Sequence, residues 1–180
     1  DNLEKILFQN PSNGVLGIGH VRWATHGVPN TVNAHPHSSD IVSVVHNGII
    51  ENSDFLKKEL LEKGHIFKSQ TDTEVITALL TENLKKNQLI DAVNKTLKNL
   101  EGSFALGIIF KNYKNLVIGA KRGSPLAVGY GNNENYIGSD SYALKAMTNK
   151  ISYLDDDDFC ILTKDHVVFN NNNKKKINKK

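Results

Sequence analysis

Cysteine is nearly absent from this sequence, since Cys160 is the only one among 180 residues. A single cysteine excludes an internal disulfide and leaves no cysteine-rich ligand set for a structural metal. A sequence with so little cysteine fits a protein of a reducing compartment. The residues on both sides of Cys160 are apolar, so we interpret it as part of a buried strand and not as a catalytic thiol.

Long hydrophobic runs are also missing. No apolar stretch approaches the length of a bilayer span, and the first residues do not follow the basic-then-apolar order of a signal peptide. We therefore expect a cytoplasmic protein without a membrane partner.

The chain body has no excess of positive charge. The formal net charge is +3, but five lysines lie within residues 174–180, and the rest carries 17 basic and 19 acidic side chains. With this balance of charges, we expect no basic surface that would bind nucleic acid. We expect one domain at residues 1–169, followed at 170–180 by a disordered Asn- and Lys-rich tail or linker. A basic arm that binds anions is the alternative.

The hydrophobic pattern changes from helical to strand-like near Ser103. Before this point we expect helices at residues 1–7, 53–63, 72–84 and 88–100 and strands at 15–22, 41–46 and 65–68. After it we expect strands at 104–110, 116–120, 126–130, 136–139, 159–162 and 167–169, with a helical turn at 141–147. This segregation favours an α+β fold in which helices cover antiparallel sheets.

The helix expected at 53–63 has the clearest boundaries. Asn52 begins a segment suited to capping it, and Gly64 is suited to ending it. Phe55, Leu56 and Leu60 are spaced to form one buried face.

Five of the seven histidines fall within residues 20–46. His35 and His37 project to the same side of an extended chain, where His26 or Asp40 would complete a metal site. Because no second group of ligands exists, a loop whose histidines bond to the backbone is the simpler interpretation. We therefore expect no metal and no cofactor.

Asn47 and Gly48 follow a strand rich in β-branched residues. The ordinary interpretation is a tight turn, in which both residues tolerate a positive φ. A turn here would also present a carboxamide N–H and a backbone N–H to one point, and an oxyanion requires two such neutral donors. The residues alone leave both interpretations open.

Thr71 and Asp72 stand at the start of a predicted helix. If either residue is simply the N-cap of that helix, the choice of residue types is explained. Alternatively, an aspartate at a strand-to-helix junction can bind an amine, while the guanidinium of Arg22 matches a carboxylate. Together in one pocket, Arg22 and Asp72 would recognise the two charged groups of a free amino acid.

Four motifs resemble, in order and spacing, the glutaminase domain of the glucosamine-6-phosphate synthases, which are glutamine:fructose-6-phosphate aminotransferases. They are GHVRWATHG at 19–27, NAHPH at 33–37, VHNGIIEN at 45–52 and TDTEV at 71–75, and RGSPL at 122–126 and ENYIGSD at 134–140 continue the match. The resemblance covers the chain up to about residue 169.

The resemblance implies a four-layer αββα sandwich of antiparallel sheets, the Ntn-hydrolase fold, with class II glutamine amidotransferase chemistry. In that family the thiolate of an N-terminal cysteine attacks the glutamine carboxamide. Ammonia leaves, and water then releases glutamate from the thioester.

The same resemblance assigns roles to residues of this chain. Arg22 would hold the α-carboxylate of glutamine, Asp72 its α-ammonium, and Asn47 and Gly48 the oxyanion. Three further residues would belong to a loop that covers glutamine, with the first also gating ammonia: Trp23, Thr25 and His26.

The sequence departs from the family at the nucleophile. Cys160 does not match the nucleophile motif, so we expect a fragment that lacks the N-terminal nucleophile strand and is inactive alone. We also expect the sugar isomerase domain, which binds fructose 6-phosphate, to be missing, and the full-length protein to be a homo-oligomer. Two alternatives remain: an amidotransferase of the amidophosphoribosyltransferase or asparagine synthetase type, or a non-catalytic amino-acid-binding module.

Overall fold

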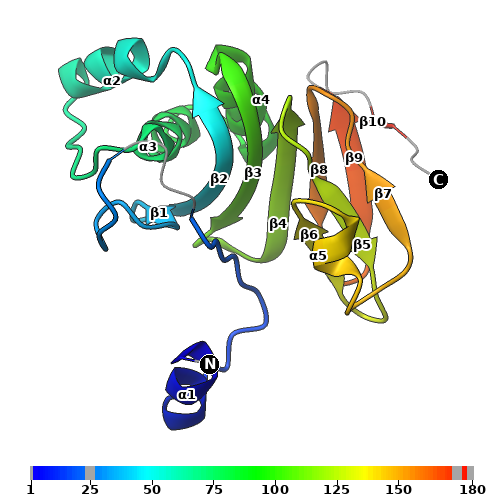
Figure 1. Ribbon diagram of the computed structural model, residues 1–180. Coiled ribbons are helices and arrows are strands. Elements are labelled where there is room, and N and C mark those ends of the chain that lie inside the picture. The colour runs from blue at the N-terminus through cyan, green and yellow to red at the C-terminus, as the bar shows by residue number, and fades with distance from the viewer. Residues whose placement is uncertain (1, 23–26, 172–175, 178–180) are drawn as a thin grey trace.

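Two antiparallel sheets and five helices form the part of the chain that the structure describes (Figure 1). The structure is a computed structural model, and it describes residues 2–22, 27–171 and 176–177. The helices are α1 (Asn2–Gln9), α2 (Ser53–Glu62), α3 (Asp72–Leu84), α4 (Leu89–Asn99) and α5 (Ser141–Leu144). The larger sheet contains, in spatial order, β1 (His37–Ser38), β2 (Val42–Ile50), β3 (Gly102–Phe110), β4 (Tyr113–Arg122), β8 (Asp158–Leu162), β9 (Val167–Asn171) and β10 (Lys176–Ile177). The smaller sheet has the order β6 (Asn135–Gly138), β5 (Ala127–Tyr130) and β7 (Ile151–Tyr153).

One hydrophobic core lies between the helices and one face of the larger sheet. α3 contacts β2 and also packs against α2 and α4. Ile76 and Leu80 of α3 and Leu106 of β3 are completely buried in this core. The helical spacing on α3 and α4 therefore predicted their buried faces correctly.

A second core lies between the two sheets, with Ala105 of β3, Val128 of β5 and Cys160 of β8 buried within it. Glycines allow this close approach, since a Cβ on Gly119 would lie 3.3 Å from Ile137 Cγ2. On the outer face of the smaller sheet, α5 contacts β5 and β6. The layers follow the predicted order αββα.

The strands predicted at 15–22 and 65–68 are wrong. Both segments belong to neither a helix nor a strand. Their β-branched residues favour extended backbone, but a strand also needs a neighbour, and no strand among the described residues pairs with either segment.

The turn predicted at Asn47 and Gly48 is also wrong, because β2 continues to Ile50. Its register with β3 is unbroken from the pair Val42 and Phe110 to the pair Ile50 and Gly102. Gly48 does adopt a positive φ of 126°, but it does so inside a paired strand.

The helix α2 matches its predicted boundaries but not its predicted contacts. Asn52 makes no side-chain capping bond; instead, its amide donates to Asn99 O and its carbonyl accepts from Glu101 N–H. Leu56 is buried as expected, whereas Phe55 is 62% exposed.

Two strands include residues of the predicted tail. Residues 170–171 complete β9, and residues 176–177 form β10, which pairs with β9. The division at residue 169 and the disorder expected at 170–180 stay predictions. Within the described ranges, no helix is long and apolar enough to cross a bilayer.

Candidate functional site

Four of the predicted site residues lie in the described part of the chain: Arg22, Asn47, Gly48 and Asp72. The other three, Trp23, Thr25 and His26, lie outside the described residues. Asn47 and Gly48 lie in the C-terminal half of β2, and Asp72 bonds to its last residue, Ile50.

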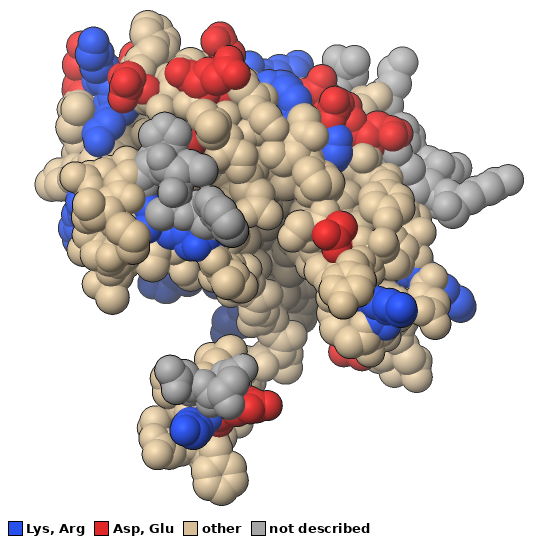
Figure 2. Space-filling model, viewed as in Figure 1, with Lys and Arg blue, Asp and Glu red and all other residues tan. Residues whose placement is uncertain are grey.

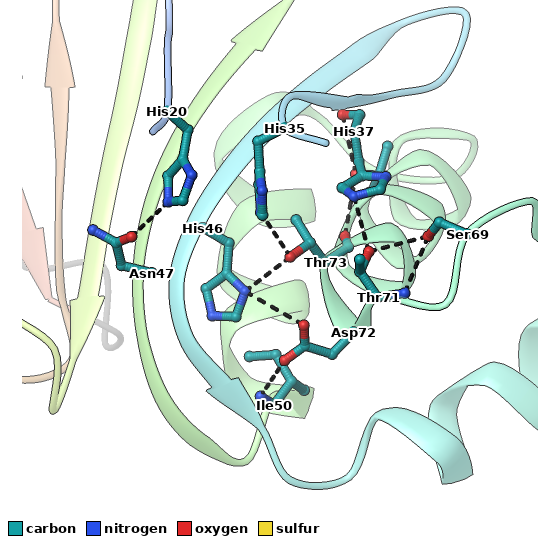
Figure 3. A network of polar contacts seen from close by, with 11 residues as sticks. His20, His35, His37, His46, Asn47, Ile50, Ser69, Thr71, Asp72 and Thr73 are labelled. Atoms are coloured by element: carbon teal, nitrogen blue, oxygen red, sulfur yellow. Dashed lines mark hydrogen bonds and ion pairs between the residues drawn. The ribbon is translucent and has the colours of Figure 1, made fainter. Parts of the chain in front are cut away.

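Successive side chains along β2 point to opposite faces of the sheet. His46 shares the face of Val42 and Val44 and is buried against α3. Asn47 therefore points to the opposite face, and Figure 3 shows it across β2 from Asp72.

Asn47 lines a cavity of about 460 Å³ between residues 17–21 and the smaller sheet. Its described lining contains no Lys, Arg, Asp or Glu. Figure 2 shows the molecule hollowed between the segment that leads from α1 and the smaller sheet, with mostly uncharged surface around the hollow. The cavity suits a neutral polar group.

Arg22 is joined to Asn47 through His20. The backbone N–H of Arg22 donates to His20 Nδ1 over 2.8 Å, and His20 Nε2 lies 2.6 Å from Asn47 Oδ1. The guanidinium donates to the carbonyls of Gly27 over 3.2 Å and Val28 over 3.4 Å. Its fork is thus directed at oxygen acceptors.

Asp72 faces β2 and does not cap its own helix. Its Oδ2 accepts the Ile50 N–H over 2.8 Å, and its Oδ1 lies 3.9 Å from His46 Nδ1. Thr71 is the N-cap residue but makes no side-chain capping bond. Thr71 therefore occupies the predicted N-cap position without the side-chain bond of a cap, and Asp72 serves β2 instead.

Glu74 instead binds the segment before α3. Its carboxylate accepts from the N–H groups of Lys68 and Ser69 and from Ser69 Oγ. These hydrogen bonds hold the pKa of Glu74 below its usual value despite the cost of its partial burial.

The predicted groups do not line one cavity. Asp72 lines a second cavity of about 230 Å³ together with Ile50, Gln70 and Thr71. Neither cavity, as lined by the described residues, includes Arg22. The structure therefore brings Arg22 together with Asn47 through His20, and brings Asp72 to the end of the same strand.

Behind the site, three histidines bond to threonine hydroxyls (Figure 3). His37 also has a backbone hydrogen bond with Asn33, as predicted for this loop. Thr73 Oγ1 lies 3.0 Å from both His35 Nε2 and His46 Nδ1, and Thr71 Oγ1 lies 2.8 Å from His37 Nε2. Among the residues that the structure describes, no group of three or more His, Cys, Asp or Glu side chains is arranged to hold a metal ion.

Burial keeps these imidazoles neutral. It lowers the pKa of His35 to about 3, with a further contribution from the nearby His20 and His37. Burial likewise lowers the pKa of His37 and of His46. Neutral rings can both donate and accept, as this network requires.

This neutrality predicts a loss of stability in mild acid. The unfolded chain protonates His35 near pH 6.5 and the folded chain only near 3, so the unfolded state binds more protons between these values. The free energy of unfolding should fall from pH 7.5 to 5, with His35 contributing on the order of 1 kcal/mol after allowance for solvent screening. Urea titrations should show a smaller fall in H35Q.

H166Q replaces an exposed histidine and is the matched control for the substitution itself. An unchanged slope in H35Q would show that the neutral His35 ring does not contribute.

Two polar residues matter more than sequence reasoning indicated. Asn33 is 1% exposed and ties two loops together, since its amide donates to Val28 O and Gln70 Oε1 while its carbonyl accepts the Gln70 N–H. His20 links Arg22 to Asn47. Both lie within the quoted motifs, but their partners are distant in sequence, so only the fold reveals their roles.

Comparison with known proteins supports the resemblance. A model of the family described as "Glutamine amidotransferase domain" matches residues 25–146. Two curated relatives are named glutamine–fructose-6-phosphate aminotransferase (isomerizing). The one from Zymomonas mobilis subsp. mobilis is 55% identical over 168 residues, covering 93% of this chain and 28% of the relative. The one from Mesorhizobium japonicum is 50% identical over 180 residues, covering 99% of this chain and 30% of the relative.

A solved structure similar to this one is the glutamine phosphoribosylpyrophosphate amidotransferase from B. subtilis, complexed with ADP and GMP. It matches with a TM-score of 0.68 and 25% identity, over 85% of this chain and 34% of that chain. This likeness confirms the predicted Ntn-hydrolase type of sandwich. The chain spans less than a third of the length of the two curated relatives. Because the family model matches more than half of its residues, the chain belongs to the glutamine amidotransferase domain family.

Proposed function

We propose that this chain binds L-glutamine and forms the ammonia-releasing part of an aminotransferase that acts on fructose 6-phosphate to make glucosamine 6-phosphate. The observation that carries this proposal is the 55% identity, over 93% of the chain, to a glutamine–fructose-6-phosphate aminotransferase. The alternative is an enzyme of the amidophosphoribosyltransferase type, with a different acceptor for the ammonia. The structural similarity supports it less strongly, because the identity is 25%.

Arg22 would bind the α-carboxylate. Its guanidinium already donates to two carbonyls, those of Gly27 and Val28, which are neutral acceptors. A carboxylate forms stronger, charge-assisted hydrogen bonds with the same fork, so it would displace them. Trp23, Thr25 and His26, between Arg22 and Gly27, would then cover the bound substrate.

Asp72 would bind the α-ammonium. The Ile50 N–H holds one carboxylate oxygen at 2.8 Å, which fixes the group at the end of β2. The second oxygen is 3.9 Å from a histidine that burial favours in its neutral form, so it keeps its capacity to accept from an amine.

Asn47 and Gly48 would stabilise the oxyanion that forms when a thiolate attacks the carboxamide. The Asn47 amide and the Gly48 backbone N–H are neutral donors at adjacent positions, which is the arrangement that a developing negative charge requires.

Cys160 would not be the nucleophile. It is completely buried between the sheets, and burial raises the pKa of its thiol to about 12. Only the thiolate attacks, so a thiol of this kind is inert at neutral pH. As the sequence holds no other cysteine, we expect no glutamate from this chain and no change in C160S.

The remaining parts of the proposal concern the whole protein. We infer a cytoplasmic enzyme in which a sugar isomerase domain binds fructose 6-phosphate and receives ammonia. We also infer that the full-length protein is a homo-oligomer. No cofactor is assigned to the glutamine site.

A calorimetric titration of the chain with L-glutamine and L-glutamate tests the proposal. Saturable binding of both, without binding of D-glutamine, is expected, because the two charged groups and the side-chain carbonyl oxygen give three points of attachment, which distinguish the enantiomers at the α-carbon. An enzymatic assay on the same samples should detect no glutamate formed from L-glutamine. Equal affinity for the two enantiomers would contradict the proposed site.

A further inference from the structure

The imidazole of His20 contacts two groups of the proposed site at once. Its Nδ1 lies 2.8 Å from the backbone nitrogen of Arg22, and its Nε2 lies 2.6 Å from Asn47 Oδ1. None of the roles assigned above uses His20. Its two contacts nevertheless determine how Asn47 is presented.

The contact with Arg22 decides the tautomer of the ring. A backbone N–H can only donate, so His20 Nδ1 must offer its lone pair. In a neutral imidazole the proton then resides on Nε2. His20 Nε2 therefore donates to Asn47 Oδ1.

This donation in turn decides the orientation of the Asn47 carboxamide. A flipped amide would place its N–H groups against the Nε2–H of His20, two donors facing each other. With Oδ1 held by His20, Nδ2 points away from the ring (Figure 3). Asn47 lines the cavity of about 460 Å³, so its side chain can present a donor there rather than an acceptor.

The His20 ring is itself held in place. It contacts the ring of His35 in a tilted arrangement, with ring centroids 4.3 Å apart and an interplanar angle of 32°. His35 in turn is bound to Thr73 Oγ1 at 3.0 Å. The ring is therefore fixed between the backbone at Arg22 and the histidine network behind β2.

We propose that His20 is a positioning residue, which holds the Asn47 carboxamide so that its N–H points at the side-chain oxygen of bound glutamine. This inference rests on the proposed function and adds a specificity determinant to it. His20 lines the same cavity as Asn47, and its proposed role is to act through the Asn47 carboxamide.

Two substitutions separate the two contacts of His20. The carbonyl of asparagine lies close to the place of Nδ1, so H20N keeps an acceptor for the Arg22 N–H and loses the donor to Asn47. The amide of glutamine reaches the place of Nε2, so H20Q keeps the donor to Asn47. A residue that served only packing would not distinguish this pair.

Nuclear magnetic resonance on the free chain gives the first test. The ring ¹⁵N shifts of His20 should report a proton on Nε2, and the Asn47 side-chain amide should be rigid in the wild type and in H20Q. In H20N that amide should become mobile. A proton on Nδ1, or an Asn47 amide equally rigid in all three proteins, would overturn the inference without any ligand.

Ligand selectivity gives the second test. Norvaline has the α-groups of glutamine but a methyl group in place of the carboxamide. H20N should weaken L-glutamine binding by up to about tenfold and leave norvaline affinity unchanged, while H20Q should restore glutamine affinity.

The outcomes distinguish the inference from the proposed function. Equal weakening of glutamine and norvaline in H20N would assign His20 a structural role and overturn the inference alone. If wild-type chain bound no glutamine, the proposed function would fail, while the resonance measurement would still decide whether His20 orients Asn47.

Discussion

Replacing Gly48 by alanine should lower the free energy of unfolding by about 3 kcal/mol or more. The φ of +126° is a conformation that residues with a side chain rarely adopt, and strain of this kind costs of order 1–3 kcal/mol. A Cβ would also lie 2.0 Å from the carbonyl oxygen of Ser103, so the backbone of β3 would have to shift. Urea titration monitored by circular dichroism measures the loss.

Two other glycines isolate these causes. A Cβ on Gly64 meets nothing within 4 Å, but its φ is +86°, so G64A should cost about 1 kcal/mol from backbone strain alone. Gly17 has neither a neighbour within 4 Å nor a positive φ, so G17A should be close to neutral. If G48A lowered the free energy of unfolding no more than G64A, β2 and β3 would not approach each other at Ser103 as closely as described.

Removing either charged group of the proposed site should weaken glutamine binding by roughly 10- to 100-fold. Hydrogen bonds to charged groups contribute about 1.5–3 kcal/mol, which corresponds to this range. R22A removes the guanidinium fork. D72N removes the negative charge but keeps an oxygen that can accept the Ile50 N–H, so the fold should be preserved.

Exposed charges elsewhere serve as controls for this comparison. Lys111 lies on the turn between β3 and β4, and Asp165 on the turn between β8 and β9. K111A and D165N change the net charge by the same amounts and should leave glutamine affinity unchanged. Equal losses in the controls would indicate a general electrostatic effect rather than a specific site.

Much of the fold could be predicted from periodicity. α3 and α4 carry apolar residues at helical spacing, and six strands after Ser103 alternate or run continuously apolar, so burial alone predicts their positions. β7 and β10 were not predicted. Residues 15–22 show the limit of this reasoning. Their pattern is that of a strand, but pairing depends on a neighbour that local sequence does not reveal.

The candidate site was predicted in part, and mainly from the family resemblance. The resemblance selected Asn47 and Gly48, but the expected turn was wrong. Glycine tolerates a positive φ inside a paired strand as well as in a turn, and Gly48 adopts it within β2. The division of Asn47 and Asp72 between two cavities depends on strand alternation and on the placement of α3. Neither can be read from spacing along the chain.

The most direct test combines truncated ligands with truncated residues. 4-Carbamoylbutanoic acid is glutamine without its α-amine, and 4-aminobutanamide is glutamine without its α-carboxylate. Calorimetry should show that D72N weakens glutamine binding but not binding of the amine-free ligand, and that R22A spares only the carboxylate-free ligand. If each variant weakened all three ligands equally, Arg22 and Asp72 would not hold the two ends of glutamine.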